Sequence, residues 1–232
     1  MFSEVLYRLS KRKSRQHLYD WIEEATRLHS LMTGKRILNI GAGGEITSRL
    51  VAMGIEFQSL DIDLARQPDI LANIESMNSL PDNSIDAIFC FEVLEHVAHP
   101  ERAASEISRI LRPGGLLIGS TPFLLGIHDA PADFYRFTRH GLRLIFSGFD
   151  ELALRERNGY FAAVATLIYR RFAHPPPLPL RLQIAAPALV ILGVLVESLD
   201  KLLPSPMATT GYFFIYRKHT APTALSSDDR HG

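Results

Sequence analysis

The segment that most constrains the fold is residues 36–45, RILNIGAGGE. A short apolar run rich in β-branched residues stops at a glycine cluster, and a helical pattern follows at once. Glycines allow a tight turn and a close approach of the backbone to a ligand, and the free N–H groups of a helix start attract negative groups. This order is typical of the strand, turn and helix that open a nucleotide-binding βαβ unit.

Such a unit carries an acidic residue about 20 residues later, at the end of its second strand, where it can hold ribose hydroxyls. Asp61 ends the apolar run 55–60 and is at this position. A glycine-rich turn alone also occurs as an ordinary connection between a strand and a helix. The other elements of the chain therefore decide between a nucleotide site and a structural turn.

Strand-like and helix-like segments alternate from residue 36 to about 157, which predicts a doubly wound α/β sheet. The run 85–91 is apolar throughout, as in a strand buried on both faces. We expect strands at 36–40, 55–60, 69–72, 85–91, 116–120, 149–157 and 212–216, and helices at about 45–53, 100–111, 139–147 and 160–172.

Three further segments complete the predicted organisation. Residues 1–33 read as an N-terminal helical segment, 34–218 as the main domain with an apolar helical insertion at 160–205, and 219–232 as a polar tail. Within the insertion, the proline-rich segment 174–179 ends a helix and 182–196 carries no charge. That stretch is short for a membrane span. It fits a helix buried against the domain or a dimer partner, or a shallow membrane attachment through 178–205.

Composition narrows the class of protein. Lysine plus arginine equals aspartate plus glutamate, 25 each, so no overall charge draws the chain to nucleic acid. The basic cluster 11–15 then reads as a solvated helix end rather than a nucleic-acid or anionic-lipid patch. Cys90 is the single cysteine, and no secretory signal is visible, so we expect a cytoplasmic protein, with peripheral contact to the inner membrane face left open. The nine histidines show no metal-ligand spacing, so we expect no metal.

Five motifs occur in a fixed order: 37–45, the strand end at Asp61, LPDNSIDAI at 80–88, EVLEHV at 92–97 and LRPGG at 111–115. Together they resemble the class I S-adenosylmethionine-dependent methyltransferases, especially the small bacterial type 11 group, over about residues 34–150. The resemblance implies S-adenosylmethionine as cofactor. It also implies a Rossmann-like, mostly parallel seven-stranded sheet whose final strand, 212–216, is antiparallel.

The resemblance also implies a set of cofactor-binding positions. Gly41 and Gly43 would let the backbone pass under the methionine and ribose, Asp61 would bind both ribose hydroxyls, and Ile62 would pack on adenine. Phe91 and Glu92 would line the sulfonium. The full set is Asn39, Gly41, Gly43, Asp61, Ile62, Asn73, Ile74, Phe91 and Glu92. Relatives often carry an acid at Asn39, a glycine at Glu45 and an aspartate at Asn73.

Two other nucleotide-binding classes fit less well. The third glycine of a dinucleotide fingerprint is replaced by Ile46, which disfavours a dehydrogenase. No P-loop lysine follows the glycines, which disfavours nucleotide triphosphate hydrolysis.

Candidate catalytic residues lie in the polar and aromatic segment 121–138, after the fifth strand. We expect His128 to act as general base, with Asp129 or Asp133 orienting it. Tyr135 is the second catalytic candidate; Tyr135 or Arg136 would hold substrate, or both would simply fasten the loop. His96 reads as a structural hydrogen-bonding residue and Cys90 as a buried hydrophobe.

The resulting hypothesis is S-adenosylmethionine-dependent methyl transfer to a small or lipid-linked acceptor, at oxygen. The insertion would cover the acceptor opening, and a homodimer is left open. The alternative is a non-catalytic or membrane-associated binding module on the same fold. RNA methylation is disfavoured by the neutral charge.

Overall fold

The computed structural model describes residues 2–15, 17–31, 34–173 and 186–220. Its centre is a seven-stranded sheet in the order β3-β2-β1-β4-β5-β7-β6. The first five strands pair in parallel, and β7 runs antiparallel to both β5 and β6. The strands are β1 Ile37–Ile40, β2 Gln58–Asp61, β3 Ile70–Leu71, β4 Ile85–Phe91, β5 Leu111–Pro122, β6 Phe149–Glu156 and β7 Gly211–Lys218.

This sheet confirms the predicted doubly wound fold and its antiparallel final strand. Several strand boundaries differ from the prediction, and the largest difference is at β5, which begins at Leu111 instead of 116. The pairing with β4 jumps from Ile85–Leu111 to Ala87–Leu116, so the residues between them form a bulge. Gly114, at φ 78°, supplies the backbone conformation that the bulge requires.

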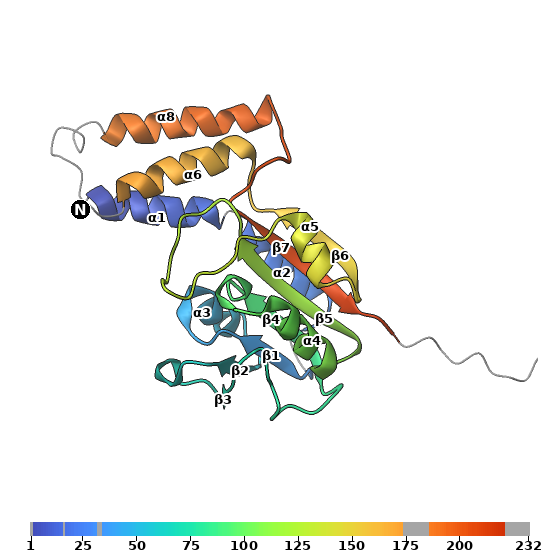
Figure 1. Cartoon of the computed structure of the whole chain (residues 1–232). Helices are drawn as coiled ribbons and strands as arrows, with labels where there is room; N and C mark the ends of the chain where they lie inside the picture. The colour runs from blue at the N-terminus through green and yellow to red at the C-terminus, as the bar shows by residue number, and fades with distance from the viewer. Residues whose placement is uncertain (1, 16, 32–33, 174–185, 221–232) are drawn as a thin grey trace, which may run out of the picture.

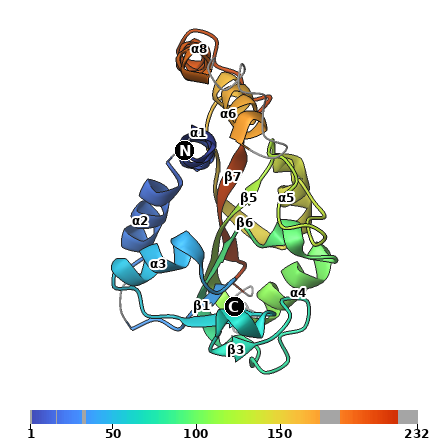
Figure 2. The same ribbon diagram turned by 90° about the vertical axis from the view of Figure 1, so that its left-hand side faces the viewer.

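Two helical layers cover the sheet (Figure 2). On one face lie α2 (Leu18–Leu28) and α3 (Gly44–Ala52), and on the other α4 (Pro100–Ile110) and α5 (Arg139–Ile145). Each layer buries an apolar stripe against strands that are themselves buried on both faces. As expected, the side chain of Thr138 caps α5, accepting a hydrogen bond from the Gly141 N–H at 3.0 Å.

Three helices stack beyond the end of the sheet, and we call them the arm: α1 (Phe2–Ser14), α6 (Tyr160–Ala173) and α8 (Ala186–Ser198). In both views α6 lies between α1 and α8, and α8 is outermost (Figures 1 and 2). The N-terminal segment, predicted as helical, is divided into α1 and α2 by a left-handed turn at His17.

Specific contacts hold the arm together. Tyr169 of α6 is buried, and its hydroxyl donates to the Val190 carbonyl of α8 at 3.2 Å. The helices approach so closely here that a β-carbon on Gly193 would come within 1.8 Å of that hydroxyl. The two oxygens of Asp200 accept the free N–H groups of Phe161 and Ala162 at 2.9 Å, which caps α6.

The outer surface of α8 is apolar. Exposed side chains of this kind are Ile191, Leu192, Val194 and Leu195, each 52–63% accessible. No described helix has both the length and the apolarity to cross a bilayer. The predictions for 174–179, 182–185 and 221–232 lie outside the described residues.

Candidate cofactor and acceptor site

A cavity of about 790 Å³ opens at the carboxyl ends of the parallel strands. Its size is typical of small-molecule sites. It spans the point between β1 and β4 where the strand order reverses, which is where open α/β sheets bind ligands. All nine predicted cofactor-binding positions line it, namely Asn39, Gly41, Gly43, Asp61, Ile62, Asn73, Ile74, Phe91 and Glu92.

The glycine turn has the backbone geometry that its sequence predicts. Gly41 and Gly43 have φ values of 91° and 82°, which non-glycine residues rarely adopt. A β-carbon on Gly41 would lie 2.7 Å from the Val93 side chain. The turn is also fixed from outside, because Asp61 Oδ2 accepts a hydrogen bond from the Ala42 N–H at 2.8 Å.

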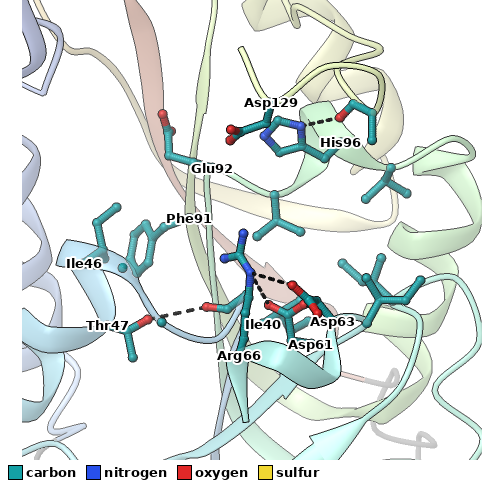
Figure 3. Close-up of a pocket in the computed structure, with 18 of the residues that line it drawn as sticks. Ile40, Ile46, Thr47, Asp61, Asp63, Arg66, Phe91, Glu92, His96 and Asp129 are labelled. Atoms are coloured by element: carbon teal, nitrogen blue, oxygen red, sulfur yellow. Dashed lines mark hydrogen bonds and ion pairs between the residues drawn. The ribbon is translucent and has the colours of Figure 1, made fainter. Parts of the chain in front are cut away.

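Asp61 keeps capacity for a ligand. Its Oδ1 accepts from the Asp63 N–H at 2.9 Å, and Arg66 Nε lies 3.8 Å from its Oδ2. Each carboxylate oxygen has two acceptor sites, so one site on each oxygen is left for a pair of ribose hydroxyls. Figure 3 shows Asp61 and Arg66 at one end of the pocket, with His96 and Asp129 at the other.

The three departures from the family pattern have local partners. The Asn39 amide donates to Thr47 Oγ1 at 3.2 Å, and Asn73 Oδ1 accepts from the Glu75 N–H at 2.9 Å. Glu45 forms ion pairs with Lys11 at 2.9 Å and with Arg15 at 3.4 Å. The Lys11 ammonium lowers the pKa of Glu45, so this added acid is ionised and neutralised by the arm.

The prediction that the basic cluster 11–15 is a solvated helix end is wrong. Lys11 and Arg15 line the cavity, and Lys13 pairs with Glu197 of α8. The reason is tertiary, because α1 packs along α6 and brings the cluster to the cavity wall. Arg170 of α6 also lines the cavity, and no local sequence signal identified it.

Glu92 follows β4 with a left-handed backbone, φ 55°. Burial favours its neutral form, but the charge of fully buried Arg157 prevails and lowers the pKa of Glu92 to about 2. Both Glu92 oxygens receive Arg157 N–H groups, and the Ser120 hydroxyl donates to Oε1 at 2.9 Å. A fixed carboxylate therefore lies in the pocket wall after β4.

His128 lines the cavity, as expected for an acceptor-side residue. Its backbone N–H donates to Asp133 Oδ2 at 2.8 Å, and its Nδ1 lies 3.6 Å from the same oxygen. Asp133 thus holds the backbone of His128, while Arg136 Nη2 donates to the ring Nδ1 at 3.3 Å. Burial lowers the pKa of His128, and burial together with the Glu92 charge raises the pKa of nearby Glu95.

Tyr135 and Arg136 fasten the loop and do not line the cavity. The Tyr135 hydroxyl donates to the Ala98 carbonyl at 3.0 Å, and Arg136 donates to Asp133 and to the Gly126 carbonyl. A catalytic role for Tyr135 stays a prediction without support from this geometry. His96 Nδ1 contacts the Ala132 carbonyl at 2.5 Å, the structural bond expected, and Cys90 is fully buried.

Residues 38–119 match the family model described as a methyltransferase domain. An uncharacterized methyltransferase of Mycobacterium bovis is 34% identical over 108 residues, 42% of this chain and 41% of that protein. A ubiquinone biosynthesis O-methyltransferase of Burkholderia vietnamiensis is 32% identical over 117 residues, 44% of this chain and 48% of that protein. The chain spans less than half the length of these curated relatives.

Solved structures share the fold. The [4+2]-cyclase SpnF matches with a TM-score of 0.57 and 20% identity, over 88% of this chain and 81% of that one. A SAM-dependent methyltransferase from Archaeoglobus fulgidus matches with a TM-score of 0.54 and 17% identity, over 91% and 99%. The matched residues, the strand order and the glycine turn agree: residues 38–119 belong to a methyltransferase domain, set in the mostly parallel seven-stranded fold that these structures share.

Proposed function

We propose that the chain transfers the methyl group of S-adenosylmethionine to an oxygen atom of a small or lipid-linked acceptor. The observation that carries the proposal is the continuity of one cavity from Asp61, past Phe91 and Glu92, to His128. The donor site and a candidate base therefore share one space.

The residues present fit the cofactor. Gly41 and Gly43 leave the strand end uncovered by side chains, and Asp61 offers two carboxylate oxygens to the ribose. The exposed side chain of Ile62 offers an apolar surface to adenine. When bound, the cofactor supplies an activated methyl group, and the protein supplies in-line positioning.

An oxygen acceptor must lose a proton, and His128 is the base that this geometry supports. Asp133 accepts from the backbone N–H of His128, Arg136 donates to the imidazole Nδ1 at 3.3 Å, and the ring lines the cavity beside Glu95. Asp133 is in turn held by Arg136, so the loop presents His128 in a defined place.

Two features support the acceptor class. Arg170 lines the cavity with its Nε buried and without a hydrogen-bond partner among the described residues, which suits an acceptor bearing a carboxylate or phosphate. The exposed apolar side chains of α8 suit a lipid surface, because this helix has no charge before Glu197 and Glu197 is paired with Lys13. A lipid-linked acceptor would meet both.

Cofactor binding is the first test. Calorimetry with S-adenosylhomocysteine should show binding to the unchanged chain and to Asp150→Asn, an exposed control on β6, and at least tenfold weaker binding to Asp61→Asn. Absence of binding to the unchanged chain refutes the function. Transfer of labelled methyl from the cofactor to a lipid or small-molecule extract would exclude the alternative, a non-catalytic binding module.

Membrane contact is tested separately. Flotation with anionic phospholipid vesicles should carry the full chain but not Leu192→Glu/Leu195→Glu. The same face of α8 could instead bind a second copy of the chain, and light scattering tests this. If the unchanged chain is a dimer and the double variant is a monomer, a second copy would be favoured over a lipid surface.

A further inference from the structure

Three side chains from two segments converge beside the acceptor end of the cavity. Glu95 and His96 belong to η2 (Leu94–His96), and His128 belongs to the loop between β5 and α5. Glu95 Oε1 lies 3.7 Å from His96 Nε2 and 3.8 Å from His128 Nε2. One ligand atom from each residue lies within 4.8 Å of the other two. These distances are too long for hydrogen bonds, so the three groups face one another without bonding.

Glu95 provides the main evidence for a bound cation. Its side chain is fully buried, and neither carboxylate oxygen has a hydrogen-bond partner among the described residues. Buried polar atoms without partners are rare, and a buried carboxylate is unfavourable unless a cation compensates it. The neighbouring arginines are already used, because Arg157 pairs with Glu92 and Arg136 pairs with Asp133.

His96 is prepared to bind a cation. A backbone carbonyl only accepts hydrogen bonds, so the 2.5 Å contact with the Ala132 carbonyl places the proton of His96 on Nδ1. Its Nε2 lone pair then faces Glu95. A carbonyl behind the ring is the usual support of a metal-binding histidine.

His128 can bind a cation through Nε2 only after a change of tautomer. Its Nδ1 faces Asp133 Oδ2 at 3.6 Å and Arg136 Nη2 at 3.3 Å. An arginine N–H only donates, so in this arrangement Nδ1 accepts from Arg136 and the neutral ring carries its proton on Nε2. A cation bound at Nε2 would shift that proton to Nδ1, where it faces the Asp133 carboxylate. The loop that carries His128 is joined to η2 as well, since the Phe134 and Tyr135 N–H groups both donate to the Glu95 carbonyl.

We propose that Glu95, His96 and His128 bind a divalent first-row transition-metal cation, for which Zn²⁺ is the probe. Two imidazoles and one carboxylate form a ligand set that zinc accepts, whereas Mg²⁺ and Ca²⁺ prefer oxygen ligands. Ligand atoms at tetrahedral zinc lie roughly 3.4 Å apart, given bond lengths of about 2.0–2.1 Å. Small side-chain rotations therefore suffice, and a fourth position is left on the cavity side.

The inference does not depend on methyl transfer, but it would change the chemistry of the acceptor. With a cation bound, His128 Nε2 is a ligand and no longer a base. A hydroxyl in the fourth position would instead lose its proton more readily because the cation stabilises the oxyanion. The cation would also join the loop to η2.

Direct metal analysis tests the site. Untagged protein is treated with a chelator, dialysed against Zn²⁺ and assayed by mass spectrometry, and Co²⁺ is used in parallel for its visible absorption. We expect about one zinc per chain in the unchanged protein and in His140→Ala, a control at an exposed histidine on α5. His96→Ala, His128→Ala and Glu95→Gln should each bind at least tenfold more weakly.

Two outcomes would overturn the proposal: an unchanged protein that retains no zinc, or ligand variants that retain as much as the control. If an alanine variant does not fold, two other measurements test the proposal: zinc binding by Glu95→Gln, which should be weaker, and the Tm of the unchanged protein, which zinc should raise. Binding of S-adenosylhomocysteine, measured in the same samples, separates this proposal from the proposed function, because either can fail while the other holds.

Discussion

Replacing Arg157 with methionine isolates the buried ion pair that fixes the end of β4. Arg157 is fully buried, and its guanidinium donates to both oxygens of Glu92. Methionine keeps much of the volume and removes the charge. Glu92, whose side chain is 15% exposed, would then lose its hydrogen-bonded cation and keep only the smaller attraction of Arg15. Removing one partner of a largely buried pair strongly destabilises proteins.

The pKa of Glu92 sets the magnitude. A fall from 4.5 to about 2 corresponds to about 3 kcal/mol, at about 1.4 kcal/mol per pH unit. Removal of one partner of a buried pair typically costs 3–5 kcal/mol. Because the folded pKa is depressed, this stability is present above about pH 4.5 and is lost as the pH falls toward 2. The deficit of Arg157→Met should therefore be largest at neutral pH.

Urea unfolding followed by circular dichroism at pH 7 and pH 4 measures the deficit. Arg155→Met is the matched control, since Arg155 pairs with Glu24 at the surface, 2.8 Å away, and should lose less than about 1 kcal/mol. The double variant Glu92→Gln/Arg157→Met should recover much of the loss. A single-variant deficit below about 1 kcal/mol, or no recovery in the double variant, would refute the reasoning.

Three further predictions concern the arm, the core and the acceptor. Gly193→Ala should destabilise the protein by about 1–3 kcal/mol, because the new methyl meets the Tyr169 hydroxyl, whereas Gly126→Ala enters open space and should leave the Tm unchanged. Burial raises the pKa of Cys90, so iodoacetamide at pH 8 should label it only in denaturant; labelling of the native protein would contradict its burial. Arg170→Met should raise the KM for an anionic acceptor at least tenfold without changing S-adenosylhomocysteine affinity, as a labelled-methyl assay and calorimetry would show.

The cavity at the ends of the parallel strands could be predicted because its signals are local. The glycine turn, Asp61 and the strand containing Phe91 are each recognisable within a few residues, and parallel strands bring their carboxyl ends together. The capping of α5 by Thr138 was predictable for the same reason. Such features depend on neighbours in sequence.

The rest depends on contacts between distant segments. Arg15 and Arg170 reach the cavity through the packing of α1 on α6, which no spacing rule describes. The histidine spacing predicted no metal, yet His128 meets His96 through a loop whose path is set by hydrogen bonds to the Glu95 carbonyl. Tyr135 was a catalytic candidate because of its residue type, but its hydroxyl donates a hydrogen bond to the Ala98 carbonyl.

The family match and the acceptor site come from different parts of the chain. The nine predicted cofactor-binding positions lie within residues 38–119, whereas Lys11, His128 and Arg170, which also line the cavity, all lie outside them. The family match therefore does not extend to these three cavity-lining positions. A cyclase with the same fold shows that the fold does not determine the reaction. Residues that select the acceptor should therefore lie in the arm and in the loop that carries His128. Comparing acceptor binding by the unchanged chain and by Arg170→Met, both with cofactor bound, would test this directly.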